Sequence, residues 1–540
     1  MSNGPFEIPT PFNEPVLGYA PGSAERASLE SRIRSMASER IDSPMIIGGK
    51  EVTSDSTFVQ TAPHRHSLEL VRGFAAENSH VEQAIAAALK AKAEWAATPL
   101  HERAAIFLKA AELMSGSRRD DMNASTMLGQ SKTVHQAEID AACELVDFLR
   151  FNVHFADKLY RDQPFSESGI WNRIDYRPLE GFLLAITPFN FTAIGGNLPT
   201  APAIMGNVVI WKPSRTQTLS AHYTMDIFRE AGLPDGVINL VHGSGRLLAD
   251  IAMAHEDFAG LHFTGSAPVL QGLWKKAGEN LDHYRAFPRI VGEGGGKDFV
   301  LAHPSAHVDA LVIALGRGAF EYQGQKCSAA SRAYIPKSLW PRVKEGIQDM
   351  VANIPMGDVA DLSNFMGAVI DQNAFNDHKA AIERAKSEGV EVVAGGGWDD
   401  SEGWFIEPTV LRTDDPRSRT MVEELFGPIL TVYVYDDAEW DETLDLVDTT
   451  SPFALTGAVF AQDRGAVQEA TDRLRNAAGN FYINDKPTGA VVGQQPFGGA
   501  RMSGTNDKAG SILNLVRWVS PRSIKETFDP PVDWRYPHMG

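Results

Sequence analysis

From residue 181 onward, short runs rich in β-branched and aromatic residues alternate with segments of helical periodicity. The runs lie at 182–186, 207–211, 236–241 and 261–264, and helical segments lie at 220–231, 247–255 and 269–280. Parallel strands need long crossover connections, which helices supply. The alternation therefore predicts a sheet built from parallel βαβ units.

A second series of the same kind begins near Asp298. Strand-like runs at 299–302, 333–335, 391–394, 429–435 and 455–461 are interspersed with helical segments at 308–320, 340–354 and 373–388. A chain of 540 residues is also too long for one simple core. We therefore expect two α/β domains, with the crossover between them at 289–298.

The N-terminal third has a different texture. Residues 1–22 have the composition of an extended arm, and Leu29, Ile33 and Met36 recur at the spacing of a short amphipathic helix. Strong helical patterns then cover 81–122 and 133–155.

Composition narrows the classes of partner and compartment. The net charge of −19 argues against nucleic acid, whose phosphates require clustered Lys and Arg. The two cysteines are expected to be reduced, and no apolar run is long enough to cross a bilayer. The N-terminus matches neither a signal peptide nor a transit peptide. We expect a cytoplasmic protein, or one of the mitochondrial matrix if it is eukaryotic with a presequence absent from this chain.

Cys327 lies in a small polar turn that contains glycine, Glu321-Tyr322-Gln323-Gly324-Gln325-Lys326-Cys327-Ser328. A structural cysteine is usually packed among apolar neighbours, whereas a nucleophile needs access and nearby groups that stabilise the thiolate. The setting favours a reactive role for Cys327. Cys143, in a helical pattern, is expected to be a packing residue.

Several other patterns fail closer tests. The glycine cluster 292–298 has the wrong spacing for a phosphate loop, and Gly243-Ser244-Gly245 lacks the third glycine of a dinucleotide fingerprint. His64 and His66 are not accompanied by HExxH or CxxC, so we interpret them as solvated loop histidines and expect no metal. No G-x-S-x-G elbow supports a serine hydrolase.

Glu293 and Asn190 are better candidates for chemistry. A carboxylate among glycines lies where backbone and ligand can approach closely, as a general base requires, although a solvated turn residue is the alternative. Asn190 follows Pro188 and suits either an Asx turn or an amide donor to a developing oxyanion.

Long ordered segments carry a resemblance. Residues 187–199 read TPFNFTAIGGNLP, 320–329 read FEYQGQKCSA, and 479–504 read GNFYINDKPTGAVVGQQPFGGARMSG. Together with 291–297 and 424–428 they resemble the aldehyde dehydrogenase superfamily, and within it the Δ1-pyrroline-5-carboxylate dehydrogenase branch. The resemblance implies an α/β fold with a Rossmann-type NAD-binding domain, an α/β catalytic domain and a small oligomerisation flap.

The resemblance also implies roles for residues. Cys327 would be the nucleophile, Glu293 the base that activates the hydrolytic water, and Asn190 with the Cys327 N–H the oxyanion hole. The cofactor would be NAD, held by Lys212, Ser214, Thr264, Gly265, Ser266, Glu424 and Phe426. The substrate would be held by Glu144, Phe191, Ser328, Gly489, Ala490 and Phe497, with core packing as the alternative for the two phenylalanines.

Within this second set the implied division of labour is specific. Ser328 and the Gly489-Ala490 backbone would bind the substrate carboxylate, because a hydroxyl and N–H donors suit it without an arginine. Glu144 would meet the ammonium, and Phe191 and Phe497 would enclose the aliphatic chain. The implied reaction is oxidation of L-glutamate γ-semialdehyde to L-glutamate, the second step of proline catabolism.

Alternatives remain open at this stage. The base motif reads EGGGKD where the superfamily has an ELGGKN-like string, and Arg215 stands where an acid often lies, which leaves NADP as a competitor of NAD. Two further interpretations also fit the sequence. The enzyme could oxidise another acidic aldehyde, such as succinate semialdehyde, or the protein could be a non-enzyme that keeps the fold.

The expected domain division follows the same resemblance. Its parts are an arm and helix at 1–40, an NAD-binding domain at 41–161 and 178–290, a catalytic domain at 291–478, a return segment with the substrate anchor loop at 479–515, and an oligomerisation flap at 162–177 and 516–540. The partner implied by the flap is a second copy of the chain, in a homodimer or higher homo-oligomer.

Overall fold

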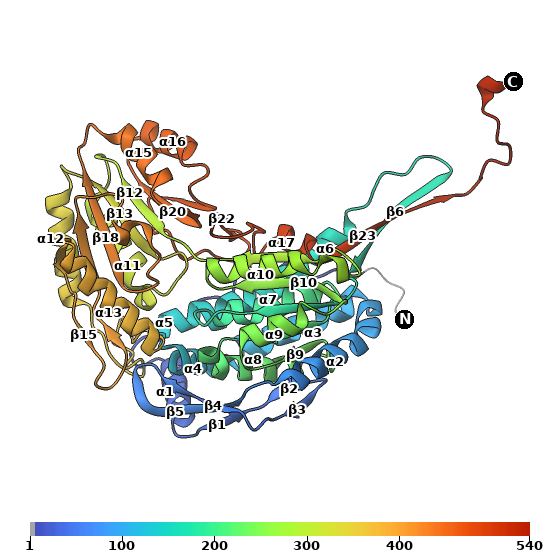
Figure 1. Cartoon of the computed structure of the whole chain (residues 1–540), viewed down its shortest axis with the longest axis horizontal. Coiled ribbons are helices and arrows are strands. Elements are labelled where there is room, and N and C mark those ends of the chain that lie inside the picture. Colours follow the sequence, from blue (N-terminus) through green and yellow to red (C-terminus); the bar gives the residue numbers. More distant parts are fainter. Residues whose placement is uncertain (1–5) are drawn as a thin grey trace.

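The first alternating series forms a seven-stranded sheet in the larger lobe of the molecule (Figure 1). The computed structural model describes residues 6–540. The strand order is β11-β10-β7-β8-β9-β2-β3, in which β7 to β11 run parallel and β2 and β3 are antiparallel additions. The strands are β2 (Met45–Ile47), β3 (Lys50–Val52), β7 (Phe182–Ile186), β8 (Val209–Lys212), β9 (Ile238–Leu240), β10 (Phe258–Thr264) and β11 (Arg289–Glu293).

The chain order reverses in the middle of this sheet. Strand β7 pairs with β8 on one side and with β10 on the other, so successive strands spread outward from β7 in both directions. In open α/β sheets, ligands bind beyond the carboxyl ends of the strands at such a reversal. Thr187 directly follows β7 and Thr264 ends β10, which makes this edge the expected position of a ligand.

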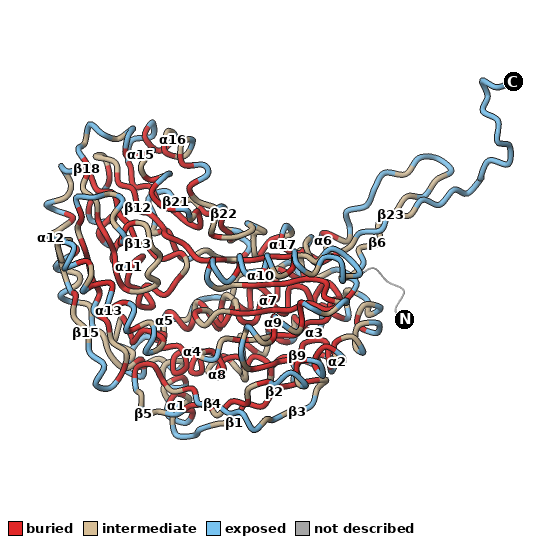
Figure 2. Tube along the Cα trace, in the orientation of Figure 1, coloured by how far each residue is buried: buried red, intermediate tan, exposed pale blue. Residues whose placement is uncertain are grey.

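Helices cover the faces of this sheet, and Figure 2 shows the buried trace concentrated within the lobes. The predicted helical stretch 81–122 is divided in two places, because Pro99 precedes the second helix and Gly116 ends it. The predicted stretch 133–155 contains a π-helical turn. The helices are α1 (Ala24–Ala37), α2 (Asn78–Ala97), α3 (Leu100–Ser115), α4 (Arg119–Gln130), α5 (Val134–Ala137), the π-helix η1 (Glu138–Glu144), α6 (Leu145–Arg161), α7 (Thr192–Ile204), α8 (Thr218–Ala231), α9 (Gly245–Ala252), α10 (Ala267–Glu279) and α17 (Ile512–Val516).

The second series forms another seven-stranded sheet, in the smaller lobe, with the order β14-β17-β18-β13-β12-β20-β21. All its pairs are parallel except β14 with β17. The strands are β12 (Asp298–Ala302), β13 (Ala330–Pro336), β14 (Glu391–Ala394), β17 (Thr409–Thr413), β18 (Ile429–Tyr435), β20 (Thr456–Phe460) and β21 (Asn480–Ile483). The predicted parallel βαβ units are confirmed in both lobes. Strand β21 shows that the segment after residue 478 begins by extending this sheet.

The second sheet is also covered by helices, and small elements decorate its edges. The helices are α11 (Val308–Phe320), α12 (Trp340–Asn353), α13 (Gln372–Ser387), α14 (Arg419–Val422), α15 (Trp440–Thr449) and α16 (Arg464–Arg473). The small strands are β15 (Trp398–Asp399), β16 (Phe405–Ile406), β19 (Phe453–Ala454) and β22 (Ala500–Arg501). The 3₁₀ turns are η2 (Arg215–Gln217), η3 (Leu281–His283), η4 (Glu321–Gly324) and η5 (Pro537–Met539).

A three-stranded sheet of order β1-β5-β4 links the lobes. It consists of β1 (Ile41–Ser43), β4 (Thr57–Ala62) and β5 (Arg65–Phe74). The β4–β5 turn docks on the smaller lobe, where the backbone N–H of Trp404 donates to the Pro63 carbonyl oxygen at 3.0 Å. His64 is consequently buried, 3.3 Å from the Asp358 carboxylate, and the His66 ring lies 3.9 Å from Trp404. The interpretation of these histidines as solvated loop residues is wrong, because their turn forms part of the contact between the lobes.

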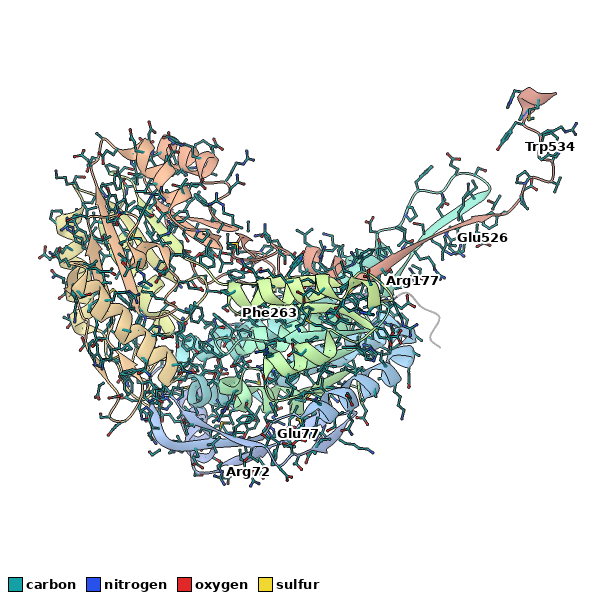
Figure 3. All side chains as sticks on the ribbon, in the orientation of Figure 1. Arg72, Glu77, Arg177, Phe263, Glu526 and Trp534 are labelled. Atoms are coloured by element: carbon teal, nitrogen blue, oxygen red, sulfur yellow. The ribbon has the colours of Figure 1, made fainter. Side chains whose placement is uncertain are left out.

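A two-stranded ribbon projects from the larger lobe (Figure 1). Strand β6 (Ile170–Pro178) pairs antiparallel with β23 (Val519–Thr527), and Arg173 forms an ion pair with Glu526 at 2.8 Å. Figure 3 shows Arg177 near the base, Glu526 farther out and Trp534 in the tail beyond, where the Trp534 residue is 78% exposed. The ribbon matches the position expected for the flap, whose role in assembly stays a prediction.

Two observations complete the fold. Both cysteines, Cys143 and Cys327, are free thiols. Among residues 6–540, no helix combines the length and the hydropathy that crossing a bilayer requires.

A buried histidine in the first sheet generates a test of the packing. His262 on β10 is buried, its ring centroid lies 4.8 Å from that of Trp518, and its Nδ1 lies 2.9 Å from the Leu198 carbonyl oxygen. Burial lowers the pKa of His262 from 6.5 to about 4. The folded protein therefore holds this ring neutral at pH values where the unfolded chain would already protonate it.

The expected outcome is a loss of stability in acid. Because the unfolded chain binds the proton first, the contribution of His262 is present above pH 6.5 and is lost as the pH falls towards 4, by up to about 3 kcal/mol. His262→Asn should flatten this part of the dependence in urea unfolding measured from pH 7.5 to 4, whereas substitution of the exposed His283, as His283→Asn, should leave it unchanged. A His262→Asn protein with the full wild-type slope would contradict the assignment.

Candidate active site

Two cavities meet between the lobes. The first has a volume of about 700 Å³ and lies at the carboxyl ends of β7, β8 and β10. The second, of about 330 Å³, is enclosed by α6, α7, the N-terminal arm, the loop before β13 and the loop after β21. The residues that line both are Phe263, Thr264, Glu293 and Cys327. Phe263 is labelled in Figure 3 on β10. A thiol and a carboxylate thus stand at the junction of the two spaces.

The loop that carries Cys327 is held in an unusual backbone conformation. Tyr322, Gln323 and Gly324 all have positive φ angles, of 49°, 54° and 65°. At Gly324 an added Cβ would lie 2.2 Å from the Gly427 carbonyl oxygen, so only glycine fits there. The Gln323 amide donates to the carbonyl oxygens of Ser131 and Ala368 at 2.9 and 2.7 Å. These contacts fix the turn that delivers Cys327 to the cavities, three residues before β13.

The electrostatic surroundings of Cys327 differ from the expectation. Burial, followed by the carboxylates of Asp298, Glu293, Glu424 and Glu144, raises the pKa of the thiol well above its ordinary value. We expected neighbouring groups that stabilise the thiolate, and this part of the prediction is wrong. These surroundings favour the neutral thiol over the thiolate.

Glu293 is the last residue of β11 and points to the same junction. Its Oε2 accepts the Gly499 N–H at 3.4 Å, and burial raises the pKa of its carboxyl well above the ordinary value. A Cβ on Gly498 or on Gly504 would come to 3.2 Å from a Glu293 carboxylate oxygen. The glycines leave room for this side chain, and the solvated-turn alternative is excluded.

Asn190 follows β7 in the turn before α7. It is buried, and its Nδ2 donates to the Gln325 carbonyl oxygen at 3.1 Å, which joins the β7 loop to the Cys327 loop. Asn190 lines the first cavity together with Cys327. An amide donor held in this position is available to a negative oxygen that develops near the sulfur.

All seven residues predicted to bind the cofactor line the first cavity. They are Lys212, Ser214, Thr264, Gly265, Ser266, Glu424 and Phe426. Burial lowers the pKa of Lys212 to about 8 and raises that of Glu424 to about 7. Glu424 accepts the Gly296 N–H at 2.8 Å, and the Phe426 ring packs edge-on against Phe189 at 5.7 Å.

The same cavity receives the N-terminus of α10. Ser266 is the N-cap of this helix, and its side chain makes no capping hydrogen bond. Free N–H groups at a helix start suit phosphate oxygens, while a lysine and a carboxylate suit ribose hydroxyls. The residues present fit a dinucleotide. Arg215 does not line the cavity, because its guanidinium lies over the Phe58 ring at 5.0 Å.

All six residues predicted to bind the substrate line the second cavity. They are Glu144, Phe191, Ser328, Gly489, Ala490 and Phe497. The Ser328 and Thr488 hydroxyls are 2.9 Å apart, beside the Gly489 turn, whose φ is 98°. Burial, with Asp140 adding to it, raises the pKa of Glu144 to about 8. Glu144 ends the π-helical turn, a distortion that often accompanies functional positions.

Several residues around the second cavity escaped the sequence analysis. Lys132 is buried, forms an ion pair with Asp140 at 2.6 Å, and has its Nζ 3.9 Å from the centre of the Phe191 ring. The Asp140 carboxylate also accepts the N–H groups of Thr192 and Ala193, which caps α7. The Lys132–Asp140 pair therefore positions Phe191. Asp140 and Thr192 are 52 positions apart in the sequence, so no local pattern reveals this contact.

The N-terminal arm forms part of the wall as well. Asn13, Glu14 and Val16 line the second cavity, and Glu14 forms ion pairs with Arg119 at 2.6 Å and Arg150 at 2.7 Å. Residues 6–20 form no helix or strand, in agreement with the arm predicted from composition, and residues 1–5 of that prediction lie outside the described part of the chain. Its contacts depend on arginines more than a hundred residues away.

A cluster of charges lies beside the Cys327 loop. Lys326 and Lys486 line the second cavity and share Glu321, at 3.1 and 3.2 Å. Although burial acts to raise it, the two ammonium groups hold the pKa of Glu321 at about 2. Two cations with one carboxylate leave this part of the cavity wall positive, which suits an anionic group. Within residues 6–540, no group of three or more His, Cys, Asp or Glu side chains is arranged to hold a metal ion.

Known proteins share this architecture over the whole chain. The model of the "Aldehyde dehydrogenase family" matches residues 52–520. The chain is 51% identical to "Delta-1-pyrroline-5-carboxylate dehydrogenase, mitochondrial" of Dictyostelium discoideum over 536 residues, which cover 98% of this chain and 96% of the relative. It is 50% identical to the human protein of the same name over 529 residues, with coverages of 98% and 94%.

A solved structure is similar to the same extent. The Δ-pyrroline-5-carboxylate dehydrogenase of Mycobacterium tuberculosis bound with NAD superposes with a TM-score of 0.97, at 56% identity and with both chains fully covered. The two α/β lobes, the order of the motifs and these likenesses agree. This chain belongs to the aldehyde dehydrogenase family.

Proposed function

We propose that this protein catalyses the NAD-dependent oxidation of L-glutamate γ-semialdehyde, which forms from Δ1-pyrroline-5-carboxylate, to L-glutamate in proline catabolism. The observation that carries the proposal is the position of Cys327 and Glu293 at the junction of two cavities, one fitted to a dinucleotide and one to a small amphoteric substrate. The names of the relatives from Dictyostelium and human support the same reaction.

The reaction begins at the sulfur. Cys327 Sγ attacks the aldehyde carbon, and the thiol proton passes to solvent through the cavities that Cys327 lines. The carbonyl oxygen becomes an oxyanion that the Asn190 amide and the Cys327 N–H would hold. NAD, when bound, supplies the acceptor for the hydride that leaves this carbon. Cys327 then carries a thioester, and Glu293 deprotonates the water that releases glutamate.

The first cavity would hold the cofactor through groups already in place. Lys212 and Glu424 would bind ribose hydroxyls, and the open N-terminus of α10 at Ser266 would bind the pyrophosphate. Phe426 would lie against the nicotinamide ring. Arg215 is engaged with Phe58 and lies outside the cavity lining, which supports NAD over NADP.

The second cavity would recognise both charges of an amino acid semialdehyde. Ser328 and the Gly489-Ala490 backbone would bind the carboxylate, and Phe191 and Phe497 would flank the chain. Glu144 would bind the ammonium group, whose positive charge restores ionisation to a carboxyl with a pKa of about 8. Succinate semialdehyde has no ammonium group, so Glu144 favours the amino acid substrate.

Assembly and compartment are further parts of the proposal. We propose that the ribbon of β6 and β23, with its exposed tail, packs against a second copy of the chain. The domain division expected from the sequence is proposed unchanged, with β21 joined to the sheet of the smaller lobe. The proposed compartment is the cytoplasm, or the mitochondrial matrix in a eukaryotic cell.

The two cysteines provide a matched test of the nucleophile. Cys327→Ala should abolish the formation of NADH from glutamate semialdehyde and leave NAD affinity within about twofold in calorimetry, because the sulfur makes the covalent bond and the dinucleotide site is built elsewhere. Cys143→Ala, which removes the other thiol of the chain, should retain most of the turnover. Measurable steady-state turnover by Cys327→Ala would contradict the assignment.

The ammonium contact is tested by a change of charge at constant shape. Glu144→Gln should raise the KM for glutamate semialdehyde by about 10- to 100-fold, the range expected for a lost hydrogen bond to a charged group. The KM for succinate semialdehyde should change far less. Asp147→Asn, in the wall of the same cavity, serves as a control, because the Asp147 carboxylate binds Asn13 and the backbone of Glu14. An equal effect of Glu144→Gln on both substrates would disprove the contact.

A further inference from the structure

Lys508 lies beside the proposed base and has no role in the functions described above. Its Nζ donates to the carbonyl oxygens of Gly479 at 2.8 Å and Gly498 at 3.0 Å, and it lies 3.4 Å from the Asn480 Oδ1. The ammonium group therefore joins the segment that starts β21 to the loop that follows it. Lys508 itself has a positive φ of 49°, which shows that the surrounding contacts hold this residue in place.

The loop that Lys508 holds is the one that binds the carboxylate of Glu293. Gly499, next to Gly498, donates its N–H to Glu293 Oε2 at 3.4 Å. Asn480 donates to the Pro496 carbonyl and accepts the Gly498 N–H, which closes the loop on the same side. Lys508 and Glu293 both line the second cavity with Cys327. A change in the position of the Lys508 ammonium would therefore reach Glu293 through a single hydrogen-bonded loop.

The other charged groups near Glu293 oppose Lys508 or are neutralised. Asp507 is negative and forms an ion pair with Arg517 at 3.3 Å. Burial lowers the pKa of His262, on the neighbouring strand β10, and raises that of the Cys327 thiol, so both environments favour the neutral group. Lys508 is thus the cation of the described chain whose charge acts directly on the Glu293 carboxylate.

Resting on the proposed function, we propose that Lys508 is a positioning residue that keeps Glu293 competent as a base for hydrolysis of the thioester. It does so in two ways. Its hydrogen bonds hold the 498–499 loop against the carboxylate, and its positive charge favours the ionised form of Glu293 in a buried setting that otherwise favours the neutral acid.

The energetics of the pair agree with this geometry. Burial is the main reason why the pKa of Glu293 is raised, and the Gly499 N–H and Lys508 act to lower it. Burial likewise lowers the pKa of Lys508, and Glu293 acts to raise it. Each group therefore stabilises the charged form of the other across the loop, as expected of opposite charges in a partly desolvated site.

The step that depends on this pair conserves atoms and charge. A water molecule gives one proton to the Glu293 carboxylate while its oxygen attacks the thioester carbon. The carbon–sulfur bond then breaks, Cys327 leaves as a thiolate that takes up the proton from Glu293, and the carboxylic acid is released. Lys508 exchanges no proton and makes no bond to the substrate.

The inference is tested with the full-length enzyme in the absence of NAD. p-Nitrophenyl acetate acylates a reactive thiol and releases p-nitrophenolate as a burst, after which the steady rate reports hydrolysis of the acyl-enzyme. We would measure burst and steady rate from pH 5.5 to 9.5 for wild type, Lys508→Met, Lys508→Arg and Glu293→Gln. Lys90→Met, an exposed lysine on α2, is the control. If Lys508→Met does not fold, Lys508→Gln, which keeps hydrogen-bond donors without the charge, replaces it.

The expected result is a shift of the pH profile. Loss of the cation raises the pKa of Glu293, so the rising limb of the deacylation rate in Lys508→Met should move up by about one pH unit. The rate at pH 7 should fall about tenfold, with the burst retained. Lys508→Arg should restore the wild-type midpoint, and Lys90→Met should match wild type. A rate lowered by the same factor at every pH, or an unchanged profile, would overturn the inference.

The Glu293→Gln arm separates this inference from the proposed function. If Glu293 is the base, this variant should show a burst followed by slow hydrolysis with no rising limb. Rapid hydrolysis by Glu293→Gln would remove Glu293 from the proposed mechanism, whatever Lys508 does. Slow hydrolysis by Glu293→Gln together with a wild-type profile for Lys508→Met would leave the proposed function intact and refute the role of Lys508.

Discussion

A half-buried thiol close to four carboxyl groups is the constraint on which the rest of the structure depends. The carboxyl ends of the β7, β8 and β10 strands face the amino ends of β12 and β13, and Cys327 and Glu293 lie where these two edges meet. Burial there raises the pKa of both groups, so neither is charged without help. This cost explains why so many hydrogen bonds converge on the two loops that carry them.

The fold follows from local patterns that act independently. Strand β7 is a continuous apolar run, β18 is rich in β-branched and aromatic residues, and the intervening segments have helical periodicity, so each unit is specified within about thirty residues. The breaks at Pro99 and Gly116 also have local causes, although the pattern of apolar residues runs across them. The β4–β5 turn is buried where the local sequence predicts a solvated loop, because the burial of His64 depends on Asp358 in the other lobe.

The candidate site shows the same division between local and distant causes. Cys327, Glu293 and Asn190 lie in motifs whose glycines and turns indicate close approach of backbone and ligand. The other predicted lining residues came from the resemblance of these motifs to the aldehyde dehydrogenase superfamily. The Lys132–Asp140 pair, the Glu14 contacts and Lys508 have no such signature. Each depends on a partner brought near by the tertiary fold, which for Asp140 is the start of α7, and a single buried lysine in a sequence gives no indication of what it will contact.

The central claim is that Cys327 rests as a neutral thiol at the junction and is activated only within the reaction. The most direct measurement is the rate of Cys327 alkylation by iodoacetamide in the absence of cofactor, followed from pH 6 to 10 on the isolated Cys327 peptide by mass spectrometry. Because burial and four carboxylates disfavour the thiolate, the rate should keep rising across the whole range, without a plateau below pH 9. A rate that levels off near pH 7 would show a stable resting thiolate and would contradict the account.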